Sequence, residues 1–180
     1  VTGRSRGQVA LIGHALPDSV AESLAELLLV LGCWEESAVF AFQRLAGRGE
    51  LQHHAQAQLL RIAREEEHHE QLLRGLRASL PTPRPDPLLK GRLRRFFLTL
   101  ESREIGVHFA RLAALDSAVC SILGELRSPK GKIHLESGIA RIFQNIHEDE
   151  ANHVRTALSL GHELAGRQLS AGLGQPQLPE

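Results

Sequence analysis

The sequence predicts an all-α protein built from long helices, and three observations support this class. Apolar residues recur at spacings of three and four over four long stretches, which is the period of an amphipathic helix. No stretch alternates apolar and polar residues as a half-buried strand does. Glycine and proline gather between the stretches, where they end helices. Four helices of roughly 30 residues would each be ~45 Å long, which are the proportions of a four-helix bundle.

The first predicted helix covers residues 18–46. Pro17 and Asp18 indicate its start, with Asp18 as the N-cap, and Gly47 and Gly49 indicate its end. Its apolar residues share one face and are Leu24, Leu27, Leu28, Leu31, Ala38, Phe42 and Leu45.

The second predicted helix covers residues 50–79, and a proline-rich linker over 80–87 follows it. The apolar face of this helix carries Ala55, Leu59, Ile62, Leu73 and Leu76. Prolines at every second position from Pro81 to Pro87 forbid a helix there. Eight extended residues reach at most ~28 Å, less than the length of the bundle. Either the next helix begins later than residue 88, or the four helices simply run up, down, up and down.

The third and fourth predicted helices cover residues 88–127 and 133–168. A break at Ser128–Gly131 separates them. The bundle therefore spans residues 18–168, between an irregular N-terminal segment, 1–17, and a flexible tail, 169–180. The apolar residues of the two helices are Leu93, Phe97, Leu100, Leu112, Leu115, Val119 and Ile122, then Ile139, Ile142, Phe143, Ile146, Ala157 and Leu160.

Composition narrows the functional classes. The chain has 180 residues, about one domain, and 21 basic residues balance 21 acidic ones, which argues against a non-specific polyanion binder. The longest apolar runs, such as Leu27–Leu31, are too short for a membrane span, so no membrane partner is expected. Two cysteines do not form a disulfide scaffold and favour a cytoplasmic location.

Each apolar face is interrupted by acidic side chains at about the same depth. Burying an ionised carboxylate without a partner costs several kcal/mol or more, so packing does not explain them. A pair of cations does, and carboxylate oxygens with imidazole nitrogens suit iron or manganese. The interrupting residues are Glu35 in the first helix, Glu66 and His69 in the second, Glu101 and Glu104 in the third, and Glu150 and His153 in the fourth.

The spacing Glu-x-x-His places both side chains one turn apart on one helix face. It occurs four times, at Glu50/His53, Glu65/His68, Glu66/His69 and Glu150/His153. The first pair sits at a helix start, and the second is rotated away from the apolar face. The last two pairs are mid-helix and on that face, which selects them as metal ligands. The competing interpretation is a solvated face, or histidines satisfied within the core.

This constellation resembles the ferritin-like di-iron carboxylate proteins, in which two helices give one Glu each and two give Glu-x-x-His. Glu35, Ala38 and Phe42 are similar to the first-helix signature of ferritins and rubrerythrins, with Phe in place of Tyr. Residues 63–71 and 101–103 resemble the tRNA isopentenyl-adenosine hydroxylases, and 149–153 resembles the Asp-Glu-x-x-His pattern of di-iron oxygenases. The resemblance covers residues 18–168.

The resemblance implies two iron ions, with manganese or a mixed pair as alternatives. Glu66 and Glu150 would bridge the ions, while Glu35 and Glu101, Glu104 or both would bind at the ends. The hydroxylase match favours Glu101, and height in the bundle favours Glu104. His69 and His153 would each give one nitrogen. Asp149 and Glu65 are candidates for orienting the imidazoles, and His108 and His147 are either extra ligands or polar wall.

Three functional classes follow from these residues. The first is an oxygenase, hydroxylase or oxidase that uses O2 and an organic substrate and needs a cavity beside the metals. The second is a ferroxidase, iron-storage or rubrerythrin-like protein, and the third is a non-catalytic helical interaction module. RNA is suggested by the hydroxylase resemblance and by the basic stretch 90–95, and a homodimer is compatible with the sequence. Small residues that would leave the cavity are Gly106, Ala110, Ala113, Ala114 and Ala118.

Overall fold

The computed structural model describes residues 17–82, 87–128 and 137–173, and this part of the chain contains helices and no strands. The prediction of an all-α protein is confirmed. The helices are α1 (Asp18–Ala46), α2 (His53–Arg77), α3 (Leu89–Leu100), α4 (Ile105–Arg127) and α5 (Ser137–Leu173).

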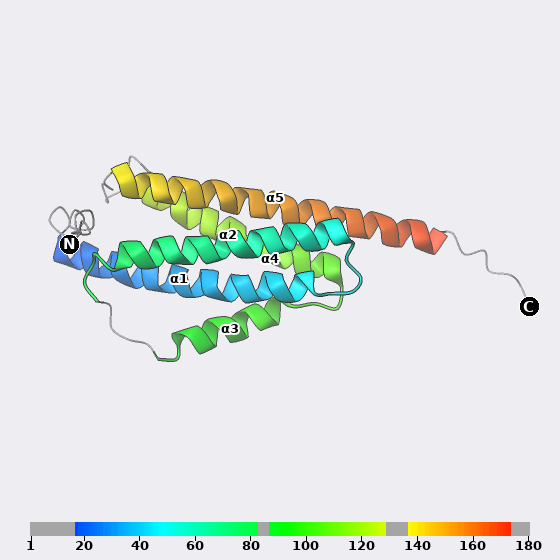
Figure 1. Ribbon diagram of the computed structural model, residues 1–180, viewed down its shortest axis with the longest axis horizontal. Helices are drawn as coiled ribbons and strands as arrows, with labels where there is room; N and C mark the ends of the chain where they lie inside the picture. The colour runs from blue at the N-terminus through cyan, green and yellow to red at the C-terminus, as the bar shows by residue number, and fades with distance from the viewer. Residues whose placement is uncertain (1–16, 83–86, 129–136, 174–180) are drawn as a thin grey trace, which may run out of the picture.

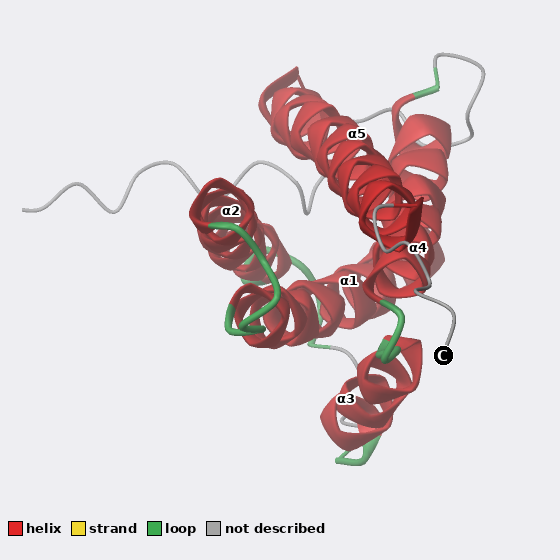
Figure 2. Ribbon diagram, turned by 90° about the vertical axis from the view of Figure 1, so that its right-hand side faces the viewer, coloured by secondary structure: helices red, strands yellow, loops and turns green. Residues whose placement is uncertain are grey.

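The four long helices form two pairs, α1 with α2 and α4 with α5 (Figure 1). The α1–α2 turn and the α3–α4 loop lie at the same end, where Arg48 Nη1 donates to the carbonyl oxygen of Ser102 at 2.6 Å. The chain therefore does not run simply up, down, up and down. The short helix α3 packs on the outside of α1 and returns the chain, so that α2 and α4 begin at one end (Figure 2).

The single helix predicted over 88–127 is wrong, because the chain leaves the helical conformation between α3 and α4. Glu101 and Glu104 are extended, with ψ of 140° and 107°. Hydrogen bonds from elsewhere satisfy the exposed backbone of this loop. Arg48 donates to the carbonyl oxygens of Ser102 and Arg103, and the Ser102 hydroxyl accepts from the Glu104 amide. No glycine or proline marks the break, which is why the sequence pattern did not reveal it.

The other helix boundaries differ from the predicted ones by a few residues. Pro17 occupies the N-cap of α1, and Asp18 lies in the first turn rather than capping it. α5 continues to Leu173, so the predicted tail begins inside this helix. Residues 1–16, 83–86, 129–136 and 174–180 lie outside the described residues, and with them most of the irregular segment 1–17, the middle of the proline linker and the rest of the tail.

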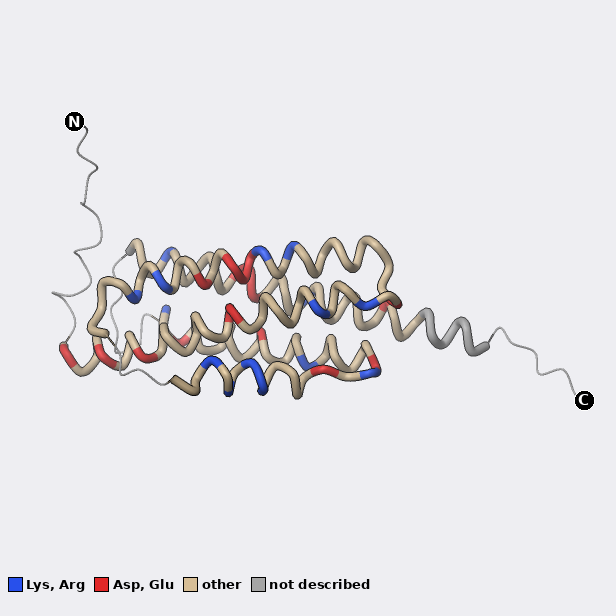
Figure 3. Tube along the Cα trace, turned by 60° about the horizontal axis from the view of Figure 1, so that its bottom comes forward, with Lys and Arg blue, Asp and Glu red and all other residues tan. Residues whose placement is uncertain are grey.

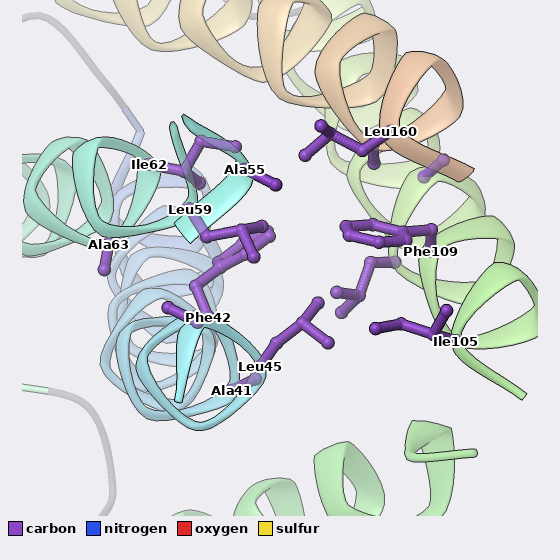
Figure 4. Close-up of a cluster of buried hydrophobic side chains, with 14 of the residues drawn as sticks. Ala41, Phe42, Leu45, Ala55, Leu59, Ile62, Ala63, Ile105, Phe109 and Leu160 are labelled. Carbon is purple, nitrogen blue, oxygen red and sulfur yellow. The ribbon is translucent and has the colours of Figure 1, made fainter. Parts of the chain in front are cut away.

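Two apolar clusters fill the interior, one on either side of a polar layer. The cluster nearer the α1–α2 turn is shown in Figure 4, where side chains from α1, α2, α4 and α5 converge. The predicted face of α4 is rotated slightly, since Ile122 is 40% exposed and Leu123 only 1%. The largest members of the first cluster include Phe42, Leu59, Ile62, Phe109 and Leu160, and those of the second include Leu28, Leu73, Leu123, Phe143 and Ile146.

Within the described residues, α4 is the one helix whose length and apolar composition would suffice to cross a membrane. Core helices share this composition, and α4 buries Phe109, Leu112, Val119 and Leu123 between its neighbours. It also buries Asp116 on the same face.

Candidate metal centre

The polar layer between the two apolar clusters consists of six buried ionisable side chains. Each replaces an apolar residue at a helical spacing of three or four, so each points inward with its apolar neighbours. Figure 3 shows acidic positions partway along the long helices, and the helix bounds place Glu35, Glu66 and Asp116 near the middle of α1, α2 and α4. The six are Glu35 from α1, Glu66 and His69 from α2, Asp116 from α4, and Glu150 and His153 from α5.

Glu66 and Glu150 lie between the two imidazoles. His69 Nδ1 is 3.4 Å from Glu66 Oε2 and 3.4 Å from Glu150 Oε1. His153 Nδ1 is 3.2 Å from Glu66 Oε1 and 3.8 Å from Glu150 Oε2. Each of these carboxylates thus presents one oxygen to each histidine. Glu35 adds a further oxygen, 4.0 Å from His69 Nδ1.

The ligand atoms form two groups, each compact enough for one cation. The first contains Glu35, Glu66, His69 and Glu150, with one ligand atom from each within 4.8 Å of the others. The second contains Asp116, Glu150 and His153, with the same spread. Glu150 belongs to both groups, and Glu66 reaches both histidines. The layer could therefore hold a metal ion, and its geometry offers two neighbouring positions.

The outer ring nitrogens of the two histidines contact acidic side chains at the rim of the layer. His69 Nε2 is 3.2 Å from Asp149 Oδ2, and His153 Nε2 is 3.0 Å from Glu65 Oε2. Asp149 directly precedes Glu150, and Glu65 directly precedes Glu66, so each helix orients the histidine of the other. An Nε2–H donated to these carboxylates leaves the Nδ1 lone pair facing inward, as a metal ligand requires.

The inward-facing atoms have no hydrogen-bond partners of their own. Buried polar atoms are almost always partnered, because an unmet donor or acceptor costs about 1–3 kcal/mol. Several such atoms converging on one layer are what a bound cation would satisfy, so the residues fit a metal. The unpartnered atoms are Glu66 Oε2, His69 Nδ1, Asp116 Oδ2, Glu150 Oε1 and His153 Nδ1.

The crowded carboxylates compete for protons when no cation is present. Burial and the neighbouring Glu66 raise the pKa of Glu35 well above its usual range. Burial and the charges of Glu150 and Glu66 do the same for the pKa of Asp116. Burial and Glu66 raise the pKa of Glu150 to about 7. Glu66 is the exception: burial opposes its charge, yet close contacts with Glu35 and with the imidazoles of His153 and His69 lower its pKa.

The two imidazoles hold protons more tightly than an ordinary histidine. Burial lowers the pKa of His69, but the close carboxylates of Glu150 and Glu66 outweigh burial and raise the pKa to about 10. Burial also opposes the charge of His153, while Glu66 and Glu150 raise its pKa to about 9. Near pH 7 the layer without a cation is therefore held together by protons on its ligand atoms.

The structure brings together five of the seven sequence-predicted ligands, namely Glu35, Glu66, His69, Glu150 and His153. It does not bring Glu101 or Glu104 to them. Glu101 forms an ion pair with Arg44, whose Nε is 2.7 Å from Glu101 Oε1, and Glu104 is exposed at the start of α4.

Asp116 occupies the place on α4 that the sequence analysis assigned to Glu101 or Glu104. The signal was present, because Leu112, Asp116, Val119 and Leu123 follow steps of four, three and four. When Leu115 and Ile122 are taken as part of the apolar face, Asp116 does not fall on that face. The resemblance around residues 101–103 also points to an acid at a different position.

The other candidates lie away from the layer or on its outside. His108 is buried but lines a different cavity. Ala110, Ala114 and Ala118 lie on the exposed side of α4, so they do not open a cavity beside the ligands. Ala113 alone of these alanines is buried, within the apolar cluster.

Comparison with known proteins does not extend the assignment, since no protein-family model, curated protein or solved structure matches the chain.

Proposed function

We propose that this chain is a ferritin-like four-helix protein that binds two metal ions and reacts with O2, as a non-haem di-iron oxidoreductase. The observation that carries the proposal is the set of six buried ligands, with one acid each from α1 and α4 and one Glu-x-x-His pair each from α2 and α5. Manganese, or iron with manganese, would suit the same ligands.

Each ligand has a role in the proposed centre. Glu66 and Glu150 would bridge two ions, because each already faces both histidines. Glu35 and Asp116 would bind at the two ends. His69 and His153 would give Nδ1, with Asp149 and Glu65 fixing the rings through Nε2. The four ionised carboxylates would balance the charge of two divalent ions.

A pair of Fe(II) ions would supply the two electrons that reduce O2 to the level of hydrogen peroxide. The apolar clusters on both sides keep bulk water from the ligands. We propose that the centre oxidises an organic molecule, and we assign no electron donor to it. RNA is a weaker candidate, supported by the basic helix α3.

The test is the uptake of O2 by the anaerobically Fe(II)-loaded protein. We expect one O2 consumed for every two irons in a rapid first turnover. Glu66→Gln should abolish the rapid phase, because it removes a charge that both ions share. Glu67→Gln is the matched control, since Glu67 is the adjacent, exposed acid of the same helix. Rapid uptake retained in Glu66→Gln would refute the proposal.

A ferroxidase is the second candidate, and one observation favours it. The small residues expected to leave a substrate cavity lie mostly on the outer side of α4. A centre enclosed by packed side chains admits O2 and iron more readily than a large substrate. Repeated Fe(II) additions distinguish the two classes: a ferroxidase turns over on iron alone, whereas a hydroxylase stops after one turnover.

We also propose a cytoplasmic location. Cys33 and Cys120 are both free, as a reducing compartment would leave them.

A further inference from the structure

A separate cavity lies at the end of the molecule where α1 ends and α4 begins. Its volume is about 560 Å³, within the range of about 300–1,000 Å³ that accommodates small molecules. None of its lining residues belongs to the candidate metal centre. The lining consists of Arg44, Leu45, Arg48, Glu101, Ser102, Arg103 and His108.

His108 is the buried polar group of this cavity. Its side chain is only 4% exposed, and neither ring nitrogen has a hydrogen-bond partner. A neutral imidazole carries one N–H donor and one acceptor, and burial normally requires both to be met. Because His108 lines the cavity, a ligand placed there could accept from its N–H.

Positive charges outnumber negative charges around the cavity. Arg44 is paired with Glu101, and Arg48 with Glu50 and the carbonyl oxygens of Ser102 and Arg103. The Arg103 guanidinium is exposed and pairs with no carboxylate among the residues that the structure describes. The lining therefore retains one uncompensated positive charge.

The start of α4 carries the acidic residue Glu104 at its N-cap position, which offsets the positive end of the helix dipole. The positive charge open to a ligand is therefore that of Arg103. Burial and the nearby Arg48 guanidinium hold the pKa of His108 below its usual range. An acceptor with a negative charge would complement both features.

We propose that this cavity binds a small organic molecule through a carboxylate or phosphate group. The oxyanion would accept hydrogen bonds from the Arg103 guanidinium and the N–H of His108, and Leu45 would contact its apolar part. Arg44 and Arg48 would keep their existing contacts and so stabilise the walls of the cavity. The inference does not depend on the metal centre, because it uses none of its residues.

The test follows the imidazole nitrogen signals of the full-length, metal-free protein by NMR. Sodium phosphate and sodium acetate are the probes, and sodium chloride at equal ionic strength is the control for screening. His108→Gln assigns the signal. We expect a saturable shift of the His108 signal with at least one oxyanion and none with chloride.

Matched arginine variants locate the binding site. Arg103→Ala should weaken the oxyanion affinity about tenfold, the effect of losing one charge-assisted hydrogen bond. Arg95→Ala, an exposed arginine on α3 outside the cavity, should leave it unchanged. Saturation by phosphate alone identifies a phosphate ligand, and saturation by acetate as well identifies a carboxylate. No saturable shift, or equal weakening in both variants, would overturn the proposal.

Discussion

At the scale of single residues, Asp116 distinguishes this centre from the one expected from sequence. It is 3% exposed and has an unpartnered oxygen, although an isolated acid in a core would be strongly unfavourable. Its neighbours Glu150 and His153 supply the other members of a cation site. A bound ion would supply the partner that this oxygen lacks.

Asp116→Asn should weaken binding of the second ion at least tenfold, because changes even to outer partners of a metal cost about 10–100-fold in affinity. Metal analysis after desalting should give about one ion per chain instead of two. Glu125→Gln, an exposed acid on the same helix, is the control and should retain both ions. Full occupancy in Asp116→Asn would remove this residue from the centre.

The protons of the metal-free layer make its stability depend on pH. The pKa values of His69 and His153 are raised to about 10 and about 9, so their stabilisation is complete below the ordinary value of about 6.5 and is lost as pH rises through 9–10. The pKa of Glu150 is raised to about 7, so its stabilisation is also lost as pH rises. The metal-free protein should therefore become less stable from pH 6.5 to pH 10.

Thermal unfolding of the metal-free protein checks this expectation, with a decrease in Tm of ~5 °C or more over that interval. His68→Ala is the control, since His68 is exposed beside His69 and should leave the dependence intact. A Tm that rises with pH would show that these groups are not protonated in the folded protein.

At the scale of helices, the part of the fold that could be predicted is the part determined by local periodicity. The helices around Glu35, Glu66 and Glu150 were found because Gly and Pro mark their ends and apolar residues fix their faces. The α3–α4 break could not be predicted in this way. Its backbone is satisfied by Arg48, which is more than fifty residues distant in sequence.

Arg48→Ala should destabilise the protein by about 1–3 kcal/mol, because the carbonyl groups of Ser102 and Arg103 lose their charged donor. Urea unfolding measures the free energy directly. Arg95→Ala lacks such a contact and should change it by about 0.5 kcal/mol or less. An equal effect of both substitutions would show that the loop does not depend on Arg48.

At the scale of the whole molecule, the helix pairs α1–α2 and α4–α5 meet across the polar layer, which divides the interior into two apolar clusters. Each pair contributes a single acid and one Glu-x-x-His pair, and each supplies the acid that orients the histidine of the other. The layer thus joins the two halves of the molecule. A cation pair would replace the protons that otherwise keep these charges together.

Metal content per chain after anaerobic Fe(II) loading and desalting measures whether the polar layer holds a pair of ions. We expect two irons per chain, lost in the variant with both Glu66→Ala and Glu150→Ala. They should be kept in the variant with both Glu67→Gln and Glu148→Gln, which changes exposed acids on the same two helices. A folded protein without stoichiometric iron, or full occupancy in the Glu66/Glu150 variant, would show that these residues do not form a two-metal centre.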